Sequence, residues 1–386
     1  MNAAPRPIVI AAGGTGGHVF PALAVADVLQ GRGAPVVWFG TQRGIEAKVI
    51  PEAGIPMVWL SVAGLRGKGF LGRLIGPCRL FAALVQSLWA FFKLKPRAVL
   101  GMGGYVTGPV GLAAKLTGCP LVLHEQNAVA GFTNRKLARF ASIVFSAMPN
   151  AFESSINAIT VGNPLRLNIE QSSDKKANLM TANNLSKDAF VSMKDEQVLS
   201  VLIVGGSQGA QVLNNVVPEA IKHTNFSLKV VHQTGLTMYE SVQDRYDSLT
   251  EIKHVINVKK FIENMMDAYL EADVVVCRSG AMTVSEISAM SLPSVLVPFP
   301  HAVDDHQTKN AKFLEQAGAA VIIPESELTA QKLSDVLTTF YEDRNRLKQM
   351  GIAARQCHLP LAAHKVADAL LDFKLKVNSN DHEVNA

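Results

Sequence analysis

The stretch IVIAAGGTGGH, residues 8–18, decides the fold, because an apolar run ends there in a glycine-rich turn and a helical pattern follows at once. A second stretch of this kind, VLIVGGSQG, occupies residues 201–209, about half a chain later. A glycine turn between a strand and a helix is typical of doubly wound α/β domains, where backbone N–H groups can bind a phosphate. The duplication predicts two Rossmann-like domains that face each other across a central cleft.

The two glycine turns lack the pattern of an NAD site. Such a site also needs an acidic residue at the end of the next strand, where it binds the ribose. The next strands end in WFGT (residues 38–41) and VHQT (residues 231–234), without Asp or Glu. These endings disfavour an NAD oxidoreductase. An alternative is that the glycines serve only tight turns and close packing, but His18 on the following helical turn favours a chemical role.

Length and composition indicate a two-domain protein of a reducing compartment. The 386 residues are too many for one ordinary core, 48% are apolar and only 18% are charged. The four cysteines form no Cys-x-x-Cys pair, which disfavours a zinc site and a disulfide framework. No signal-peptide pattern precedes the first expected strand. We therefore expect a cytoplasmic protein.

Apolar runs alternate with helical patterns throughout, as in parallel sheets. In the first half we expect strands at 8–12, 36–39, 57–60, 98–100, 121–123, 142–145 and 158–161, and helices at 19–30, 71–92 and 108–116. In the second half we expect strands at 199–204, 228–232, 254–258, 274–276, 294–297 and 320–323, and helices at 211–222, 262–269, 283–290, 307–316 and 328–350.

Composition also divides the chain into segments. Residues 1–166 are expected to form an N-terminal domain, and residues 167–197 a polar linker or insertion. Residues 198–357 are expected to form a C-terminal domain. A last helix, 358–377, packs on either domain and can cross back to the first, and a polar tail, 378–386, is expected to be disordered.

Residues 53–124 contain no Asp or Glu but eight basic residues among apolar and aromatic ones. This mixture suits an anionic membrane surface, and no nucleic-acid motif organises the charges, so we expect no nucleic-acid partner. We expect Gly64–Ile75 to contact the membrane. The run Leu80–Phe92 is too short to span it, and the sequence leaves open whether this run is a core helix. The basic residues are Arg66, Lys68, Arg73, Arg79, Lys93, Lys95, Arg97 and Lys115.

Seven motifs resemble, in order, those of the MurG family, the N-acetylglucosamine transferases of peptidoglycan synthesis. They are GGTGGH (13–18), PALA (21–24), GGY (103–105), HEQN (124–127), GNPLR (162–166), GGSQG (205–209) and CRSGAMTVSE (277–286). The resemblance runs from about residue 8 to residue 318. It is interrupted by the polar insertion at 168–197 and by one extra residue in HAVDDHQ (301–307).

The resemblance implies an inverting glycosyltransferase of the α/β GT-B fold. Its donor is UDP-GlcNAc, and its acceptor is the 4-hydroxyl of undecaprenyl-pyrophosphoryl-MurNAc-pentapeptide (lipid I), which becomes lipid II. The resemblance implies that residues 198–357 bind the donor and that residues 1–166 bind the acceptor and the membrane. The resemblance places the protein peripherally on the cytoplasmic face of the inner membrane, beside other cell-wall synthesis proteins. The sequence has no Asp-x-Asp motif, so we expect no metal and no cofactor. Helix N-termini and glycine N–H groups then stabilise the leaving UDP.

Glu286 has two interpretations. It follows Thr283 by three residues, as the glutamate of a capping box does. The resemblance implies instead that its carboxylate accepts both ribose hydroxyls of the uridine. By the same resemblance the Ile262 backbone reads the uracil, and Gln307 reads hydroxyls of the sugar. The remaining substrate-binding residues are expected to be Thr15, Gly16, Gly17, Asn127, Arg166, Ser207, Ala281, Met282, Thr283, Val284 and Ser285.

The catalytic candidates are His18 and Glu125. An imidazole suits removal of a proton from an attacking alcohol at neutral pH. His18 is favoured, although it could merely cap the glycine loop. Glu125 follows His124 at the end of a strand and is the competing base, and the sequence does not decide between the two. Rival functions are another GT-B glycolipid glycosyltransferase, a UDP-GlcNAc epimerase, and a non-catalytic, membrane-docked scaffold that binds nucleotide sugars.

Overall fold

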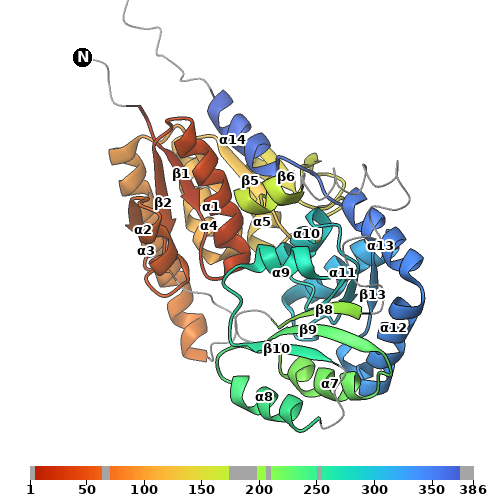
Figure 1. The fold of residues 1–386 in the computed structure, drawn as a ribbon. Helices are drawn as coiled ribbons and strands as arrows, with labels where there is room; N and C mark the ends of the chain where they lie inside the picture. The colour runs from red at the N-terminus through yellow and green to blue at the C-terminus, as the bar shows by residue number, and fades with distance from the viewer. Residues whose placement is uncertain (1–4, 63–69, 174–197, 206–209, 250–253, 374–386) are drawn as a thin grey trace, which may run out of the picture. The chain divides into compact units, whose positions relative to one another are not determined.

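The computed structural model describes residues 5–62, 70–173, 198–205, 210–249 and 254–373, and for residues 70–75 it describes the backbone alone. The chain divides into two compact units (Figure 1). Unit 1 comprises Met1–Gln126, Ala130–Pro164 and Leu361–Ala386, and unit 2 comprises Asn127–Val129 and Leu165–Pro360. Ser207, the side chains of the Gly64–Ile75 segment, most of the polar linker and the tail lie outside the described residues.

Unit 1 is built on a parallel sheet of seven strands in the order β3-β2-β1-β4-β5-β6-β7. The order reverses between β1 and β4, which is where ligands bind in doubly wound sheets. The strands are β1 (Ile8–Ala11), β2 (Val36–Gly40), β3 (Met57–Trp59), β4 (Ala98–Gly101), β5 (Leu121–Glu125), β6 (Ile143–Ser146) and β7 (Ala158–Thr160).

Helices cover both faces of this sheet because successive β1 residues point in opposite directions. Ile8 and Ile10 pack in a core with α1 (Gly16–Gly31) and α14 (Ala362–Asp372). Val9 and Ala11 pack in a second core with α3 (Phe70–Leu94) and α4 (Gly104–Thr117). The last helix therefore belongs to unit 1. Two short helices, α2 (Glu46–Glu52) and α5 (Phe132–Leu137), complete the regular helices that we name in this unit.

Unit 2 repeats the pattern with a six-stranded parallel sheet in the order β10-β9-β8-β11-β12-β13. Its reversal lies between β8 and β11, directly before the second glycine turn. The strands are β8 (Val198–Val204), β9 (Ser227–Gln233), β10 (Val255–Lys259), β11 (Val274–Cys277), β12 (Ser294–Leu296) and β13 (Ala320–Ile322). The helices are α7 (Gln211–Lys222), α8 (Tyr239–Asp247), α9 (Met265–Glu271), α10 (Ala281–Ala289), α11 (His306–Gln316), α12 (Ala330–Glu342) and α13 (Arg344–Gln356).

The expected fold class of two doubly wound α/β domains is confirmed, and each expected strand is present within one or two residues at either end. The single helix expected over 328–350 was wrong. Asp343 leaves helical geometry (φ −115°, ψ 78°) and its carboxylate accepts the N–H of Arg346, which starts a new helix. The short helices α2 and α5 and the polar helix α8 were not anticipated.

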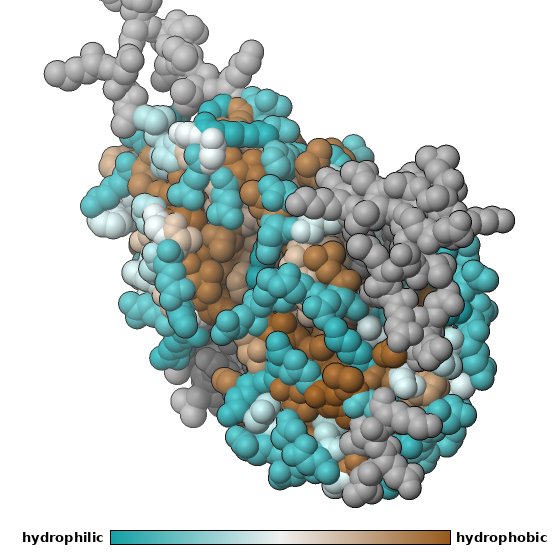
Figure 2. All heavy atoms as spheres, viewed as in Figure 1, coloured by the Kyte–Doolittle hydropathy of each residue, from teal (hydrophilic) through white to brown (hydrophobic). Residues whose placement is uncertain are grey.

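Helix α3 shows whether the apolar run Leu80–Phe92 is a core helix. Ala83, Ala90 and Phe91 are buried against the sheet, whereas Phe81, Trp89 and Phe92 are 67%, 62% and 80% exposed. The helix is therefore a core element that also presents an apolar outer face. Elsewhere the surface is mixed, and on the face drawn in Figure 2 hydrophobic residues show between hydrophilic ones. Among the helices in the described part of the chain, none is both long and apolar enough to cross a membrane.

Unit 2 contains a buried histidine whose charge state couples to folding. His232 Nδ1 accepts the Tyr246 hydroxyl proton at 2.9 Å when Nε2–H donates to Asn214 Oδ1 at 3.1 Å. Burial lowers the pKa of His232 from 6.5 to about 3, so the folded chain holds a neutral ring. The unfolded chain takes up a proton below pH 6.5 that the folded chain does not. Stability from His232 is thus full above pH 6.5 and is lost as pH falls toward 3.

We predict that acid destabilises unit 2 through His232. Between pH 6.5 and pH 5 this residue should remove about 2 kcal/mol of unfolding free energy. A His232→Asn variant should be less stable at pH 7 but should lose correspondingly less on acidification. Urea unfolding followed by circular dichroism at both pH values measures the difference, with exposed His223→Asn on the same unit as the control. An equal pH dependence in the parent and in His232→Asn would contradict the assignment.

Candidate functional site

The first glycine loop of unit 1 is shaped by close packing of the protein's own atoms. Gly14 has a φ of +93°, and a Cβ atom there would lie 3.0 Å from the Tyr105 ring. A Cβ atom on Gly13 would lie 2.6 Å from the Glu46 carboxylate, and one on Gly16 would lie 2.9 Å from the Phe20 ring. Close packing therefore explains why glycine stands at these positions. Any chemical role of the loop must come from the residues beside these glycines.

His18 lies on the first turn of α1 and is partly exposed. Its Nδ1 is 3.2 Å from Thr15 Oγ1, the side chain that precedes the helix. The turn from β4 into α4 passes beside the ring, since Cβ atoms on Gly103 and Gly104 would lie 3.4 Å and 3.7 Å from it. Both glycines have positive φ, so this turn can approach the imidazole closely without a side chain between them.

Glu125, the second candidate, is only 2% exposed. Its Oε2 accepts the N–H of Gly131 at 3.1 Å and the side-chain amide of Asn134 at 2.9 Å. The Asn134 amide also lies beside Gly103, because a Cβ atom on Gly103 would be 3.2 Å from it. The two candidates are thus brought to the same turn, but the Glu125 carboxylate is enclosed by donors from its own unit.

His124, beside Glu125, is a neutral core residue. Its Nε2 lies 2.9 Å from the Gly162 carbonyl, and the Gln126 amide lies 3.2 Å from Nδ1. Burial lowers the pKa of His124 to about 4, against a smaller opposing effect of the Gly162 carbonyl. His124 therefore ties the β5 turn to the Gly162 turn and does not titrate near neutral pH.

In unit 2, the N-terminus of α10 follows β11 at the sheet's reversal point. Gly280 is its N-cap in extended geometry, and Ala281, Met282 and Thr283 form the first turn. The N–H groups of a first helical turn are donors suited to an anion. Glu286 comes in the second turn, so the capping-box interpretation is wrong: Thr283 is not the N-cap.

Glu286 is held on the side of α10 by Tyr269 of α9. The buried Tyr269 hydroxyl donates to Glu286 Oε2 at 2.9 Å. Burial raises the pKa of Glu286, while the Tyr269 hydroxyl and the positive charge of Arg166 act to lower it. Three elements thus converge here: α9, α10 and the segment that begins unit 2. The sequence analysis named Glu286 and Arg166 but missed Tyr269, for which no motif gave a signal.

The Ile262 backbone, expected to read a base, precedes α9. Its N–H donates to Gln233 Oε1 at 3.0 Å, across from the end of β9. Gln233 is 2% exposed. The side chain of Gln233 therefore sets the position of the Ile262 peptide, and it is a second residue that the sequence analysis missed.

Asn310 of α11 contacts two further segments of unit 2. Its Oδ1 accepts the N–H of Ala128 at 2.8 Å, and its Nδ2 donates to Asn127 Oδ1 at 3.2 Å and to the Ser279 carbonyl at 3.1 Å. Ser279 in turn donates its hydroxyl to the Gln307 carbonyl at 2.8 Å. The expected residues Asn127 and Gln307 are therefore joined through Asn310 and Ser279.

The Gln307 side chain itself is anchored, since its Oε1 accepts the N–H of Phe299 at 2.9 Å. The loop before it contains the extra residue of the HAVDDHQ segment. Asp304 and Asp305 both have positive φ, at 55° and 53°, which non-glycine residues adopt rarely. Two successive residues in left-handed geometry therefore precede α11, which begins at His306.

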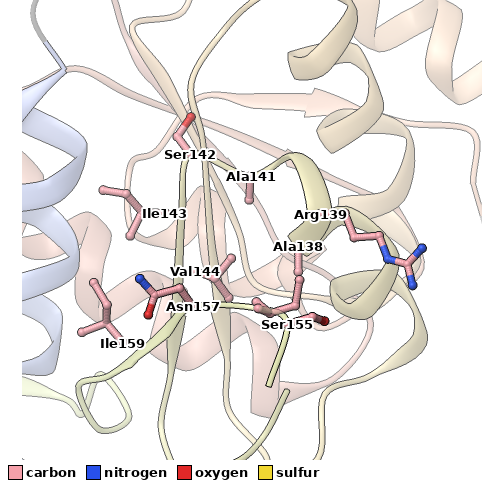
Figure 3. A pocket seen from close by; sticks show the side chains of 10 residues that line it. Ala138, Arg139, Ala141, Ser142, Ile143, Val144, Ser155, Asn157 and Ile159 are labelled. Carbon is pink, nitrogen blue, oxygen red and sulfur yellow. The ribbon is translucent and has the colours of Figure 1, made fainter. Parts of the chain in front are cut away.

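We also examined the described residues for metal-binding clusters and for pockets near these two sites. In the described ranges, no group of three His, Cys, Asp or Glu side chains is placed to hold a metal ion. A separate hollow of unit 1 lies beside β6 and β7 (Figure 3), and none of the predicted site residues lines it. Its lining is Ala138, Arg139, Ala141, Ser142, Ile143, Val144, Ser155, Ile156, Asn157 and Ile159.

Comparison with known proteins covers both units. Residues 8–146 match the glycosyltransferase family 28 N-terminal domain, and residues 200–370 match its C-terminal domain. The chain is 46% identical over 368 residues to the UDP-N-acetylglucosamine–N-acetylmuramyl-(pentapeptide) pyrophosphoryl-undecaprenol N-acetylglucosamine transferase of Methylococcus capsulatus, covering 95% of this chain and 98% of that protein. It is 44% identical to the Pasteurella multocida transferase of the same name, with 96% and 99% covered.

Comparison with solved structures also finds matches over nearly the whole chain. The crystal structure of Acinetobacter baumannii MurG matches with a TM-score of 0.79 and 38% identity, over 95% of this chain and 99% of that one. A Neisseria meningitidis UDP-GlcNAc 2-epimerase matches at 14% identity and a TM-score of 0.62, over 94% and 98%, which shows a shared fold alone. With both units matched to their family models and close relatives over nearly the whole length, the chain belongs to glycosyltransferase family 28.

Proposed function

We propose that this chain transfers N-acetylglucosamine from UDP-GlcNAc to the 4-hydroxyl of undecaprenyl-pyrophosphoryl-MurNAc-pentapeptide. The names of its relatives supply the substrate class. The observation that carries the proposal is the arrangement at α10: a helix N-terminus for the pyrophosphate beside a carboxylate, Glu286, that is oriented by Tyr269. A nucleoside diphosphate sugar presents a diphosphate and a ribose diol, which match these two features.

The donor-binding roles follow from that geometry. The first-turn N–H groups of Ala281, Met282 and Thr283 stabilise the charge on UDP as it leaves, with Arg166 as a nearby cation. Glu286 accepts the ribose hydroxyls through the oxygen that Tyr269 does not engage. The Ile262 peptide, held by Gln233, reads the uracil. Because the sequence has no Asp-x-Asp motif, we assign the charge stabilisation to these groups and expect no divalent cation to be required.

The reaction moves one proton and one glycosyl group. The acceptor oxygen bonds to the anomeric carbon from the face opposite UDP, the bond from that carbon to the phosphate oxygen breaks, and the hydroxyl proton goes to a base. We assign the base to His18, which is partly exposed, rather than to Glu125, whose Oε2 accepts two hydrogen bonds inside unit 1. In the tautomer whose Nδ1–H donates to Thr15 Oγ1, Nε2 takes the proton.

Peripheral attachment to the inner membrane is proposed through the outer face of α3. Phe81, Val85, Trp89 and Phe92 are exposed at helical spacing on one side of it. Lys93 lies 3.6 Å from the Trp89 ring, so apolar and basic groups occur together there. Neighbouring α4 adds exposed Leu116. Apolar insertion and attraction to anionic lipid act together on such a face. The contribution of Gly64–Ile75 remains part of this proposal.

Donor affinity tests the α10 assignment. Glu286→Ala should weaken UDP-GlcNAc binding by roughly 1.5–3 kcal/mol, because a charge-assisted hydrogen bond is lost. Tyr269→Phe should weaken it by about 1 kcal/mol, because the carboxylate loses its orienting hydroxyl. Isothermal titration calorimetry with UDP measures both, and Tyr341→Phe on α12 is the matched control. Unchanged affinity in a stably folded Glu286→Ala protein would sink the assignment.

Turnover tests the choice of base. His18→Ala should lower kcat by about 10²–10⁴-fold, the usual contribution of a general base, while UDP affinity stays within twofold. Glu125→Gln should cost less, since the amide can still accept a hydrogen bond from Asn134. A soluble acceptor analogue separates this effect from membrane binding. If Glu125→Gln abolishes turnover and His18→Ala does not, the roles are reversed.

Vesicle binding tests the α3 face. Changing Phe81, Trp89 and Phe92 together to Ser should reduce co-sedimentation with anionic vesicles and slow transfer to a vesicle-borne acceptor. Transfer to a soluble analogue should be spared. The control changes exposed Val255 and Leu270 of unit 2 to Ser. Parent-like vesicle binding by the triple variant would show that another surface attaches the protein.

A further inference from the structure

Directly behind the first glycine loop, unit 1 encloses an acidic side chain that the proposed reaction does not use. Glu46, the first residue of α2, has no exposed surface. Its Oε2 accepts the N–H of Gly14 at 2.9 Å. Its Oε1 accepts the N–H of Thr41 at 3.0 Å and the Thr41 hydroxyl at 2.8 Å. Three donors therefore face one carboxylate in the interior.

Glycines form the recess in which this carboxylate lies. A Cβ atom on Gly13 would lie 2.6 Å from Glu46 Oε1, and one on Gly40 would lie 2.9 Å from Glu46 Cγ. A Cβ atom on Gly44 would overlap the carboxylate itself. The glycines come from the ends of β1 and β2 and from the turn before α2. The space is thus fitted to a carboxylate by three separate segments.

A glycine loop before a helix ordinarily offers its N–H groups to a bound phosphate. Here the Gly14 N–H already binds an anion that belongs to the protein. Burying a carboxylate is unfavourable unless donors replace its water, and Gly14 and Thr41 supply them. The loop therefore holds its shape through an internal partner and does not depend on a phosphate ligand for it.

We propose that Glu46 is a built-in carboxylate ligand of the first glycine loop and a positioning residue for His18. The proposal rests on the proposed role of His18 as the base. Gly14 is followed by Thr15, whose hydroxyl contacts His18 Nδ1 at 3.2 Å. On the other side, the Thr41 hydroxyl, which donates to Glu46, is 3.4 Å from the hydroxyl of Tyr105, whose ring packs on Gly14.

The β4–α4 turn also contacts the glycine loop and the His18 ring. A Cβ atom on Gly104 would lie 3.3 Å from the Gly13 carbonyl oxygen and 3.7 Å from the His18 ring. The glycine loop, the β4–α4 turn and the imidazole therefore lie next to one another, with at most a methyl-sized space between the turn and the ring. A shift of Gly14 away from Glu46 moves Thr15, and the His18 ring shifts with it. Small displacements of a catalytic group are costly to turnover.

The test replaces Glu46 by Gln, which keeps the size but turns an amide NH₂ toward one of the donors. We expect kcat with a soluble acceptor analogue to fall at least tenfold, while the affinity for UDP stays within twofold. Glu52→Gln, on the exposed end of the same helix, is the matched control and should change neither. Parent-like kcat in Glu46→Gln would overturn the proposal.

Chemical rescue covers the case in which Glu46→Gln folds poorly. Glu46→Ala leaves a carboxylate-sized recess lined by the same donors, so sodium formate should restore part of kcat, and sodium chloride at equal ionic strength should not. Rescue is assayed at a temperature where circular dichroism shows a folded protein with and without formate. A folded Glu46→Ala enzyme that has lost turnover and does not respond to formate would also overturn the proposal.

A double-mutant cycle links the effect to His18. If Glu46 acts by positioning the imidazole, Glu46→Gln should lower kcat less than threefold in a His18→Ala background. An equal loss in both backgrounds would assign Glu46 a structural role and overturn the positioning proposal. The single His18→Ala variant reports independently on the proposed function: if it keeps full turnover, the assignment of the base fails whatever Glu46 does.

Discussion

The constraint on which both units depend is that parallel strands end at the same edge of a sheet. Where the strand order reverses, between β1 and β4 in unit 1 and between β8 and β11 in unit 2, the following loops must diverge to opposite faces. The divergence leaves helix N-termini and backbone N–H groups at that edge. His18 follows β1, and Glu286 lies on the helix that follows β11, so the same constraint supplies each unit with its chemically distinctive residue.

Three partly or fully buried carboxylates show how donors decide the role of an acid. Glu125 and Glu46 are enclosed by N–H, amide or hydroxyl donors of unit 1. Glu286 is oriented by Tyr269 on one oxygen, beside the positive charge of Arg166. A carboxylate whose oxygens already bind protein donors shapes the site around it, whereas one with remaining acceptor capacity can bind a ligand. This distinction underlies the assignment of Glu286 to the substrate and of Glu46 to the loop.

Helix α3 shows why an apolar run alone does not settle burial. Its small residues, such as Ala83 and Ala90, allow close packing on the sheet, while its aromatic residues Phe81, Trp89 and Phe92 face outward. Both faces are hydrophobic, so neither composition nor the run length distinguishes them. Only the packing of α3 beside α4 fixes which side is turned to the core.

The sequence by itself determined the two doubly wound sheets, because strand-like runs, glycine turns and helical patterns are local signals. It also named His18, Glu125 and Glu286 as candidates, because they stand in motifs that resemble those of a known family. Tertiary structure alone decided their partners. Glu46 was not among the candidates, because an acid was looked for only at the end of β2, in residues 38–41, as part of an NAD site; Glu46 lies five residues beyond Thr41 and turns back to Gly14. Tyr269, Gln233 and Asn310 likewise contact segments 17 or more residues away, and hydrogen bonds across such separations leave no periodic pattern in a single sequence.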